Sequence, residues 1–179
     1  MEATFTVTMQ EVYDEVAQTT SYTGAKMDDD ANAYERIFTT DEDKSQLKRF
    51  WDESCIAFCE AMKKYLASDT PTYETILPIK PGITTAAITD IVVRPGNLIQ
   101  GNENGHEFKL ALSQSFDEAL LPSMRKELTS YFVMNITAKW YIFTNKKEAD
   151  GYAAMASELL DGLRRKACYK KKPTRPTYN

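Results

Sequence analysis

Two cysteines lie four residues apart, a spacing that could place two metal ligands on one helix face. Cys55 and Cys59 have this spacing, and cysteine thiolates are common ligands of tetrahedral zinc. Such a site needs two further ligands, and the chain offers only His106 and Cys168, neither at a recognised spacing. We therefore predict that Cys55 and Cys59 are buried apolar side chains, and that the protein binds no metal or other cofactor.

The single histidine, His106, is the other candidate for chemistry, as a general acid or base. It falls in a turn rich in glycine and asparagine, with no nucleophile or carboxylate at a fixed spacing. Acidic runs at 28–30 and 41–43 lack the alternating pattern and the glycine of a calcium loop. Negative charges at helix N-termini explain these runs without a ligand. We predict that the protein has no catalytic residues and is not an enzyme.

The C-terminal segment is strongly basic, which suits binding to an acidic partner. From residue 164 onward the chain has seven basic residues and no acidic ones. Of the 22 basic and 26 acidic residues in the chain, 15 basic and all 26 acidic ones thus fall in 1–163, a formal charge of −11. A segment with so few apolar side chains cannot form its own core. It is either a solvated end or an arm that becomes ordered on a partner, and we predict an arm. Its predicted partner-binding residues are Arg164, Arg165, Lys166, Lys170, Lys171, Lys172, Arg175 and Tyr178.

Length and composition indicate an ordinary globular domain. The chain has 179 residues, of which 42% are hydrophobic and 27% are charged, as in soluble proteins that form a single core. No apolar run approaches the roughly 20 residues that a membrane-spanning helix needs, and the N-terminus does not resemble a signal peptide. An odd number of cysteines, three, favours folding in the reducing cytosol.

Helical periodicity dominates the first part of the chain. Thr8 and Glu11 form a capping-box pattern, which predicts a helix that ends near Gly24. Apolar residues at helical spacing predict a short helical segment at 33–38 and a long helix from 40 to 66.

Helical periodicity returns in the last third of the chain. A second capping-box pattern at 115–118, followed by Pro122 in the first turn, predicts a helix whose apolar stripe reaches Phe143. A last helix is expected at 149–163, and short loops between long helices make neighbours antiparallel.

The middle of the chain has the character of β-structure. Prolines and glycines separate short runs rich in β-branched residues, which predict a small antiparallel sheet. The three expected strands are 73–79, 83–93 and 106–113. We predict an α+β fold that is mainly α: an antiparallel helix bundle, one domain at 1–163, with a β insertion at 73–114 and an extended basic C-terminal arm at 164–179.

Several short motifs follow one another as in a family of viral assembly proteins. They are VTMQEV at 7–12, DDD at 28–30, YL at 65–66, LPSM at 121–124, AKWY at 138–141 and LLDGLRR at 159–165. Together with a β insertion between two helical halves, they resemble the head–tail connector, or adaptor, proteins of tailed bacteriophages. The overall plan is also similar to that of neck-ring proteins of crAss-like phages.

The resemblance implies a structural role in the virion. Family members form a homo-oligomeric ring of about twelve copies, a closed heterologous assembly, beneath the portal. By the resemblance, the C-terminal arm contacts the portal protein, and the opposite face receives the next neck or tail protein. Genomic DNA passes through the lumen, where acidic groups repel duplex phosphates. The protein would be made in the host cytoplasm and would end at the head–tail junction.

Three other interpretations remain open at this stage. The chain could be a small nucleic-acid-binding protein that uses its basic tail on phosphates, although the acidic body opposes approach to DNA. It could be a tail-completion protein on the tail side of the neck. An uncharacterised enzyme that depends on His106 is the third alternative.

Overall fold

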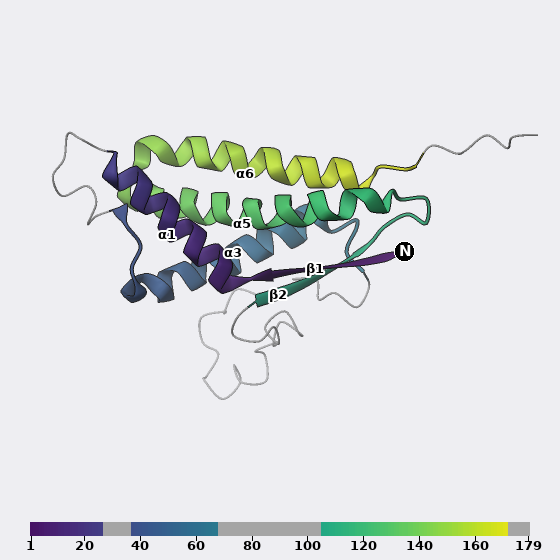
Figure 1. Ribbon diagram of the computed structural model, residues 1–179, viewed down its shortest axis with the longest axis horizontal. Coiled ribbons are helices and arrows are strands. Elements are labelled where there is room, and N and C mark those ends of the chain that lie inside the picture. The colour runs from purple at the N-terminus through teal and green to yellow at the C-terminus, as the bar shows by residue number, and fades with distance from the viewer. Residues whose placement is uncertain (27–36, 68–104, 172–179) are drawn as a thin grey trace, which may run out of the picture.

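The computed structural model describes residues 1–26, 37–67 and 105–171 of the chain (Figure 1). In chain order the elements are β1 (Glu2–Thr8), α1 (Met9–Ala25), the 3-10 turn η1 (Asp41–Asp43), α3 (Lys44–Met62), β2 (Gly105–Ala111), the 3-10 turn η2 (Glu118–Leu120), α5 (Leu121–Thr144) and α6 (Lys146–Ala167). The described part is mainly helical and contains one antiparallel sheet of two strands. This confirms the predicted fold class at that level. None of the described helices is both long and apolar enough to cross a bilayer.

β1 and β2 pair in an antiparallel ribbon, although they lie far apart in the sequence. Phe5 is opposite Phe108, and Val7 is opposite His106. Side chains of β1 alternate strictly between buried and exposed, with Ala3, Phe5 and Val7 on the inner face. Alternation of this kind is what a strand with one buried face requires. The sequence analysis missed β1, because its partner is so distant that no hairpin signal marks it.

The predicted β insertion at 73–114 is wrong in the pairing of its last strand. Two of its three expected strands, 73–79 and 83–93, lie outside the described residues. The third corresponds to β2, but its partner is the N-terminal strand and not a neighbour within the insertion. The opposite edge of β2 bonds to the chain just after α3, since the amide of Ala67 donates to the carbonyl of Lys109 at 3.0 Å. β2 thus ties the start of the chain to the end of α3.

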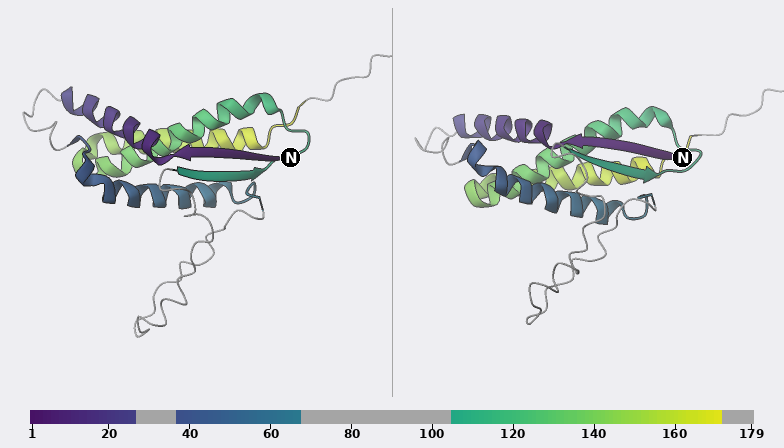
Figure 2. Two further views of the ribbon diagram at one scale, coloured as in Figure 1. Left: turned by 60° about the horizontal axis from the view of Figure 1, so that its bottom comes forward. Right: turned by 90° about the horizontal axis from the view of Figure 1, so that it is seen from below.

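Aromatic side chains form the centre of the core. The Phe58 ring packs against Phe108 of β2, and the Trp51 ring stacks on Phe132 of α5, each pair with centroids 4.8 Å apart. Both contacts have the tilted or offset geometry that aromatic pairs prefer. Figure 2 shows the ribbon running lengthwise beside α3 and α5, so this cluster joins the sheet to both helices.

α5 and α6 form an antiparallel pair separated by a single residue, Asn145. Near the turn, the Tyr141 and Tyr152 rings meet edge to face with centroids 5.1 Å apart. On α6 the buried residues are Ala149, Ala156, Leu163 and Ala167, and the first three of these are seven positions apart. Seven-residue spacing makes a narrow seam of the kind seen in coiled coils, and the small alanines allow the two helices to approach closely.

Two predicted capping boxes differ from the structure in detail. α1 begins after Thr8 as predicted, but the Thr8 hydroxyl donates to the Glu11 carboxylate at 2.9 Å instead of capping a backbone amide. At 115–118 the capping residue is Asp117, which accepts from the Ala119 amide at 3.2 Å and starts η2. An aspartate caps the turn that immediately follows it, and here that turn is η2. α5 therefore begins only after η2, at Leu121, and Pro122 lies in its first turn as predicted.

The end of α5 also differs from the predicted stripe. Phe143 was expected in the core, yet it is 70% exposed and only stacks on Phe50, with ring centroids 6.2 Å apart. Trp140 and Tyr141 are still buried, whereas Ile142 and Phe143 are exposed, so Phe143 lies on the outer side of the last turn of α5.

Candidate functional site: the end of the last helix and the groove beside it

The basic segment begins inside α6, and this corrects the predicted start of the arm at residue 164. α6 continues to Ala167, so Arg164, Arg165 and Lys166 are helical. Residues 164–167 contain no helix breaker, and positive side chains in the last turn interact favourably with the negative end of the helix dipole. These three residues are therefore positioned by α6, and their contact with a partner stays a prediction.

Groups of α6 itself and of α5 already bind these three side chains. Lys166 donates from Nζ to the Glu127 carboxylate and to the Ser123 hydroxyl, the latter at 2.5 Å. Arg164 pairs with Asp161 at 3.6 Å. Arg165 donates from Nε to the Asp161 carbonyl at 3.3 Å. The Lys166 contact joins the end of α6 to the beginning of α5 and belongs to the fold.

The extended segment begins only after Ala167, and its first residues are tied to the body. The Lys171 amide donates to the Ser115 carbonyl at 2.8 Å, and Lys170 forms an isolated antiparallel bridge with Phe116. The side chains of Lys170 and Lys171 are exposed and make no ion pair with any residue that the structure describes. The described part of the segment ends at Lys171, at the end of the molecule where the N-terminus lies (Figure 1).

Three of the predicted partner-binding residues, Lys172, Arg175 and Tyr178, lie outside the described residues. Of the eight, the structure thus places three in α6 and two in the extended segment. Next to them, the Tyr65 hydroxyl contacts the thiol of Cys168, and this hydrogen bond raises the pKa of Tyr65.

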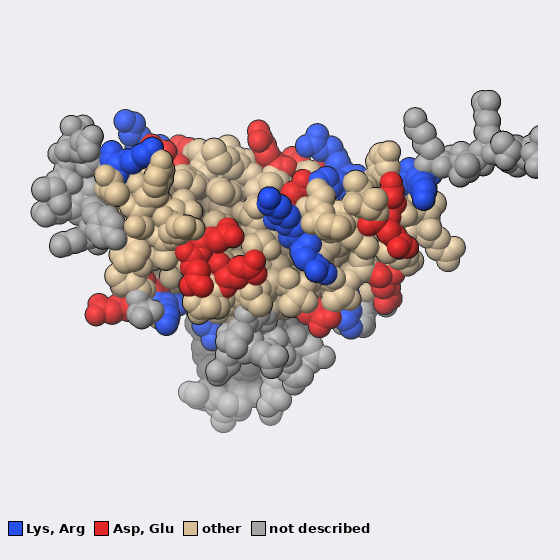
Figure 3. Space-filling view, in the orientation of Figure 1, with Lys and Arg blue, Asp and Glu red and all other residues tan. Residues whose placement is uncertain are grey.

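Acidic side chains occupy a separate surface. Figure 3 shows them gathered over the N-terminal part of α1. Glu11, Asp14 and Glu15 are all exposed there, and α1 (Met9–Ala25) contains no basic residue. The charge asymmetry read from the sequence is therefore also an asymmetry in space, since the basic segment leaves from the far end of α6.

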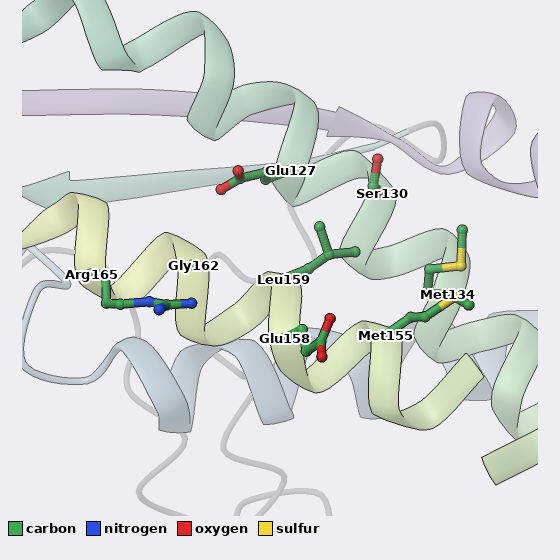
Figure 4. Close-up of a pocket in the computed structure, with 8 residues that line it drawn as sticks. All are labelled: Glu127, Ser130, Met134, Met155, Glu158, Leu159, Gly162 and Arg165. Atoms are coloured by element: carbon green, nitrogen blue, oxygen red, sulfur yellow. The ribbon is translucent and has the colours of Figure 1, made fainter. Parts of the chain in front are cut away.

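A groove lies between α5 and α6 on the outer surface, and the sequence analysis did not anticipate it. It has a volume of about 760 Å³. Met134 and Met155 line one end, Arg165 and Glu127 lie toward the other, and Leu159 and Glu158 lie between them (Figure 4). The lining residues are Glu127, Ser130, Met134, Met155, Glu158, Leu159, Gly162 and Arg165. A methionine, a leucine and a glycine at helical spacing, Met155, Leu159 and Gly162, are the signal that could have indicated it.

The cysteines and the histidine do not form a site among the described residues. Cys55 and Cys59 are buried as predicted, and burial raises the pKa of the Cys59 thiol to about 12 and that of Cys55 well above its usual value. His106 was expected in a turn, but it is a buried residue of β2 whose ring lies 4.4 Å from that of Phe108. Within the described ranges, no three metal-ligating side chains cluster.

Comparison of the chain with protein-family models, with curated proteins and with solved structures finds no match.

Proposed function

We propose that this protein is a structural, non-enzymatic subunit of the neck ring that joins the portal to the tail in a tailed bacteriophage. The observation that carries the proposal is the extended basic segment at the end of an acidic helical body. Lys170 and Lys171 are exposed and lack acidic partners among the described residues, while Lys166 is bound internally. A segment with this character is suited to an acidic surface on another protein, such as a portal subunit.

The arrangement of the helices supports the same proposal. Helices from both halves of the chain, α3 and α5, pack on one shared aromatic core. β2, which pairs with the N-terminal strand, packs on the same core through Phe108. Each subunit of the proposed ring is an antiparallel helical bundle. About twelve of these subunits are arranged head to tail around one axis and close into the ring. The acidic surface over α1 is our candidate for the lumen, where it would let duplex DNA pass without binding.

The test is a native mass spectrum of the full chain, alone and with the portal protein of the same virus. We expect a closed oligomer near twelve copies, alone or on the portal. A chain ending at Lys171 should retain its fold, because it keeps the bond from Lys171 to Ser115, and should lose portal binding. A matched control with 172–179 replaced by a neutral segment of equal length separates charge from length. Unchanged portal binding by both variants would refute the role of the arm.

A second candidate function is nucleic-acid binding, favoured only by the two exposed lysines and the basic residues that follow them. It predicts an affinity for duplex DNA that falls steeply as salt rises, because several phosphates would be neutralised. The exposed carboxylates of Glu11, Asp14 and Glu15 oppose it. A monomer with strongly salt-dependent DNA binding would replace the ring proposal. A tail-completion protein would instead form its ring without affinity for the portal.

A further inference from the structure

Two surfaces complement each other and have no partner among the residues that the structure describes. The first, which we call the knob, is the exposed segment formed by Tyr169, Lys170 and Lys171. The second is the α5–α6 groove. We propose that the knob of one copy binds in the groove of a second copy, and that this is the repeating contact of the ring. The inference rests on the proposed function and adds which surfaces meet: Tyr169, Lys170 and Lys171 contact the neighbouring copy, and the basic residues among 172–179 are left for the portal.

The knob presents an aromatic ring and two charges on a fixed backbone. Tyr169 is 50% exposed, and its ring pairs with no other aromatic ring in the part of the chain that the structure describes. The Tyr169 amide donates to the Lys166 carbonyl at 2.9 Å, and the Lys171 amide donates to the Ser115 carbonyl at 2.8 Å. Because the backbone is already held, binding costs less conformational entropy than ordering a free chain would.

The groove offers the matching chemistry. Met134, Met155 and Leu159 line its apolar part, and Met155 is 53% exposed. Methionine is flexible and polarisable and makes favourable contacts with aromatic rings. Glu158 lines the groove, is exposed, and forms no ion pair with the described residues. A tyrosine followed by two lysines therefore suits both the apolar and the acidic part of this surface.

The position of the basic groove residue sets the direction of binding. Arg165 lines the end of the groove nearer the α6 C-terminus. Like charges repel, so the lysines of the knob should lie toward Glu158 and away from Arg165.

The geometry requires a second copy. The bond between Lys171 and Ser115 holds the knob at the end of α6, and Tyr169 is not among the residues that line the groove of its own chain. Knob and groove are different surfaces, so each copy uses its knob on one neighbour and its groove on the other. A contact of this heterologous kind closes into a ring if the rotation allows it.

Two glycines of α6 provide a matched pair of variants for the test. A Cβ at Gly162 would lie 3.5 Å from the Glu127 carboxylate, an ordinary contact, and a longer side chain would fill the groove. A Cβ at Gly151 would meet nothing within 4 Å. Gly162→Leu and Gly151→Leu both raise helix propensity, so neither should unfold α6. In native mass spectra across a concentration series, we expect Gly162→Leu to raise the dissociation constant of self-association about tenfold or more. Gly151→Leu should leave it unchanged.

Charge reversal tests the polar half of the contact. Glu158→Lys alone and Lys170→Glu with Lys171→Glu should each weaken self-association, and the three changes together should restore part of it. Tyr169→Ala should also weaken it, whereas Tyr22→Ala, at a tyrosine that is exposed to 62% against 50% for Tyr169, should have no effect. Circular dichroism of each variant confirms that the fold is retained.

A mixture of two variants tests whether the contact between copies is heterologous. Tyr169→Ala retains a groove and Gly162→Leu retains a knob, so an equimolar mixture should form 1:1 pairs that neither variant forms alone. A wild-type ring that Gly162→Leu leaves intact would overturn this inference but not the proposed function. The inference would also be overturned if the wild-type chain remained monomeric to about 100 µM or formed only a twofold dimer. Measurements of portal binding and DNA binding would then decide between the proposed functions.

Discussion

Lys166 provides the sharpest test of whether the last turn of α6 belongs to the fold or to a partner. Its ammonium group donates to the Glu127 carboxylate and to the Ser123 hydroxyl. The side chains of Lys166 and Glu127 are 25% and 26% exposed. The second carboxylate oxygen of Glu127 is buried and accepts no hydrogen bond from the described residues. Lys166→Ala would therefore leave a largely buried carboxylate with neither oxygen paired to a cation.

The exposure of the pair sets the expected magnitude. A solvent-exposed ion pair contributes about 0–1 kcal/mol to stability, and removing one partner of a fully buried pair costs about 3–5 kcal/mol. A pair that is a quarter exposed lies between these limits, so we expect Lys166→Ala to lower the free energy of unfolding by about 2 kcal/mol. For a chain of this length, that corresponds to a fall in Tm of about 4–8 °C.

Urea and thermal unfolding followed by circular dichroism measure this change. Lys170→Ala is the control, because Lys170 is exposed and makes no ion pair with the described residues; it should change stability by less than about 0.5 kcal/mol. A double-mutant cycle of Lys166→Ala with Glu127→Ala should show coupling between the two positions. Equal stability of the Lys166→Ala and Lys170→Ala proteins would refute the assignment of Lys166 to the fold.

Three further predictions concern the core, the thiols and an ion pair. Trp140→Phe removes the indole N–H that donates to the Ile37 carbonyl at 2.7 Å; leaving that carbonyl unpaired should cost about 1–3 kcal/mol in urea unfolding. In a thiol titration at pH 8, the folded protein should react at Cys168 alone, since the other two thiols are buried with raised pKa values, and Cys168→Ser should abolish the reaction. A hydrogen bond from Lys139 lowers the pKa of Glu53 below 4.5, so stability from this pair is complete above pH 4.5 and declines as pH falls through the lowered pKa. Lys139→Met should therefore flatten the acid side of the stability profile, and an unchanged slope would contradict this.

Local patterns account for the parts of the fold that were predicted correctly. The apolar spacing in α3 places Leu47, Trp51, Phe58 and Met62 in the core, because a period of 3.6 residues determines which side chains share a helix face. The same spacing predicted correctly that both helical cysteines are buried. Composition revealed the opposite charges of the body and the C-terminal segment without any structure.

The sequence by itself thus determined the helices, their buried faces and the charge asymmetry of the chain. Only the tertiary structure decided that residues 2–8 pair with residues 105–111, that Lys166 binds Glu127, 39 positions away, and that a methionine-lined groove opens between α5 and α6. The physical reason is the range of the interactions. Periodicity and capping act within a few residues and leave a mark on the local sequence, whereas strand partners, ion pairs and grooves depend on which distant segments the shared core brings together.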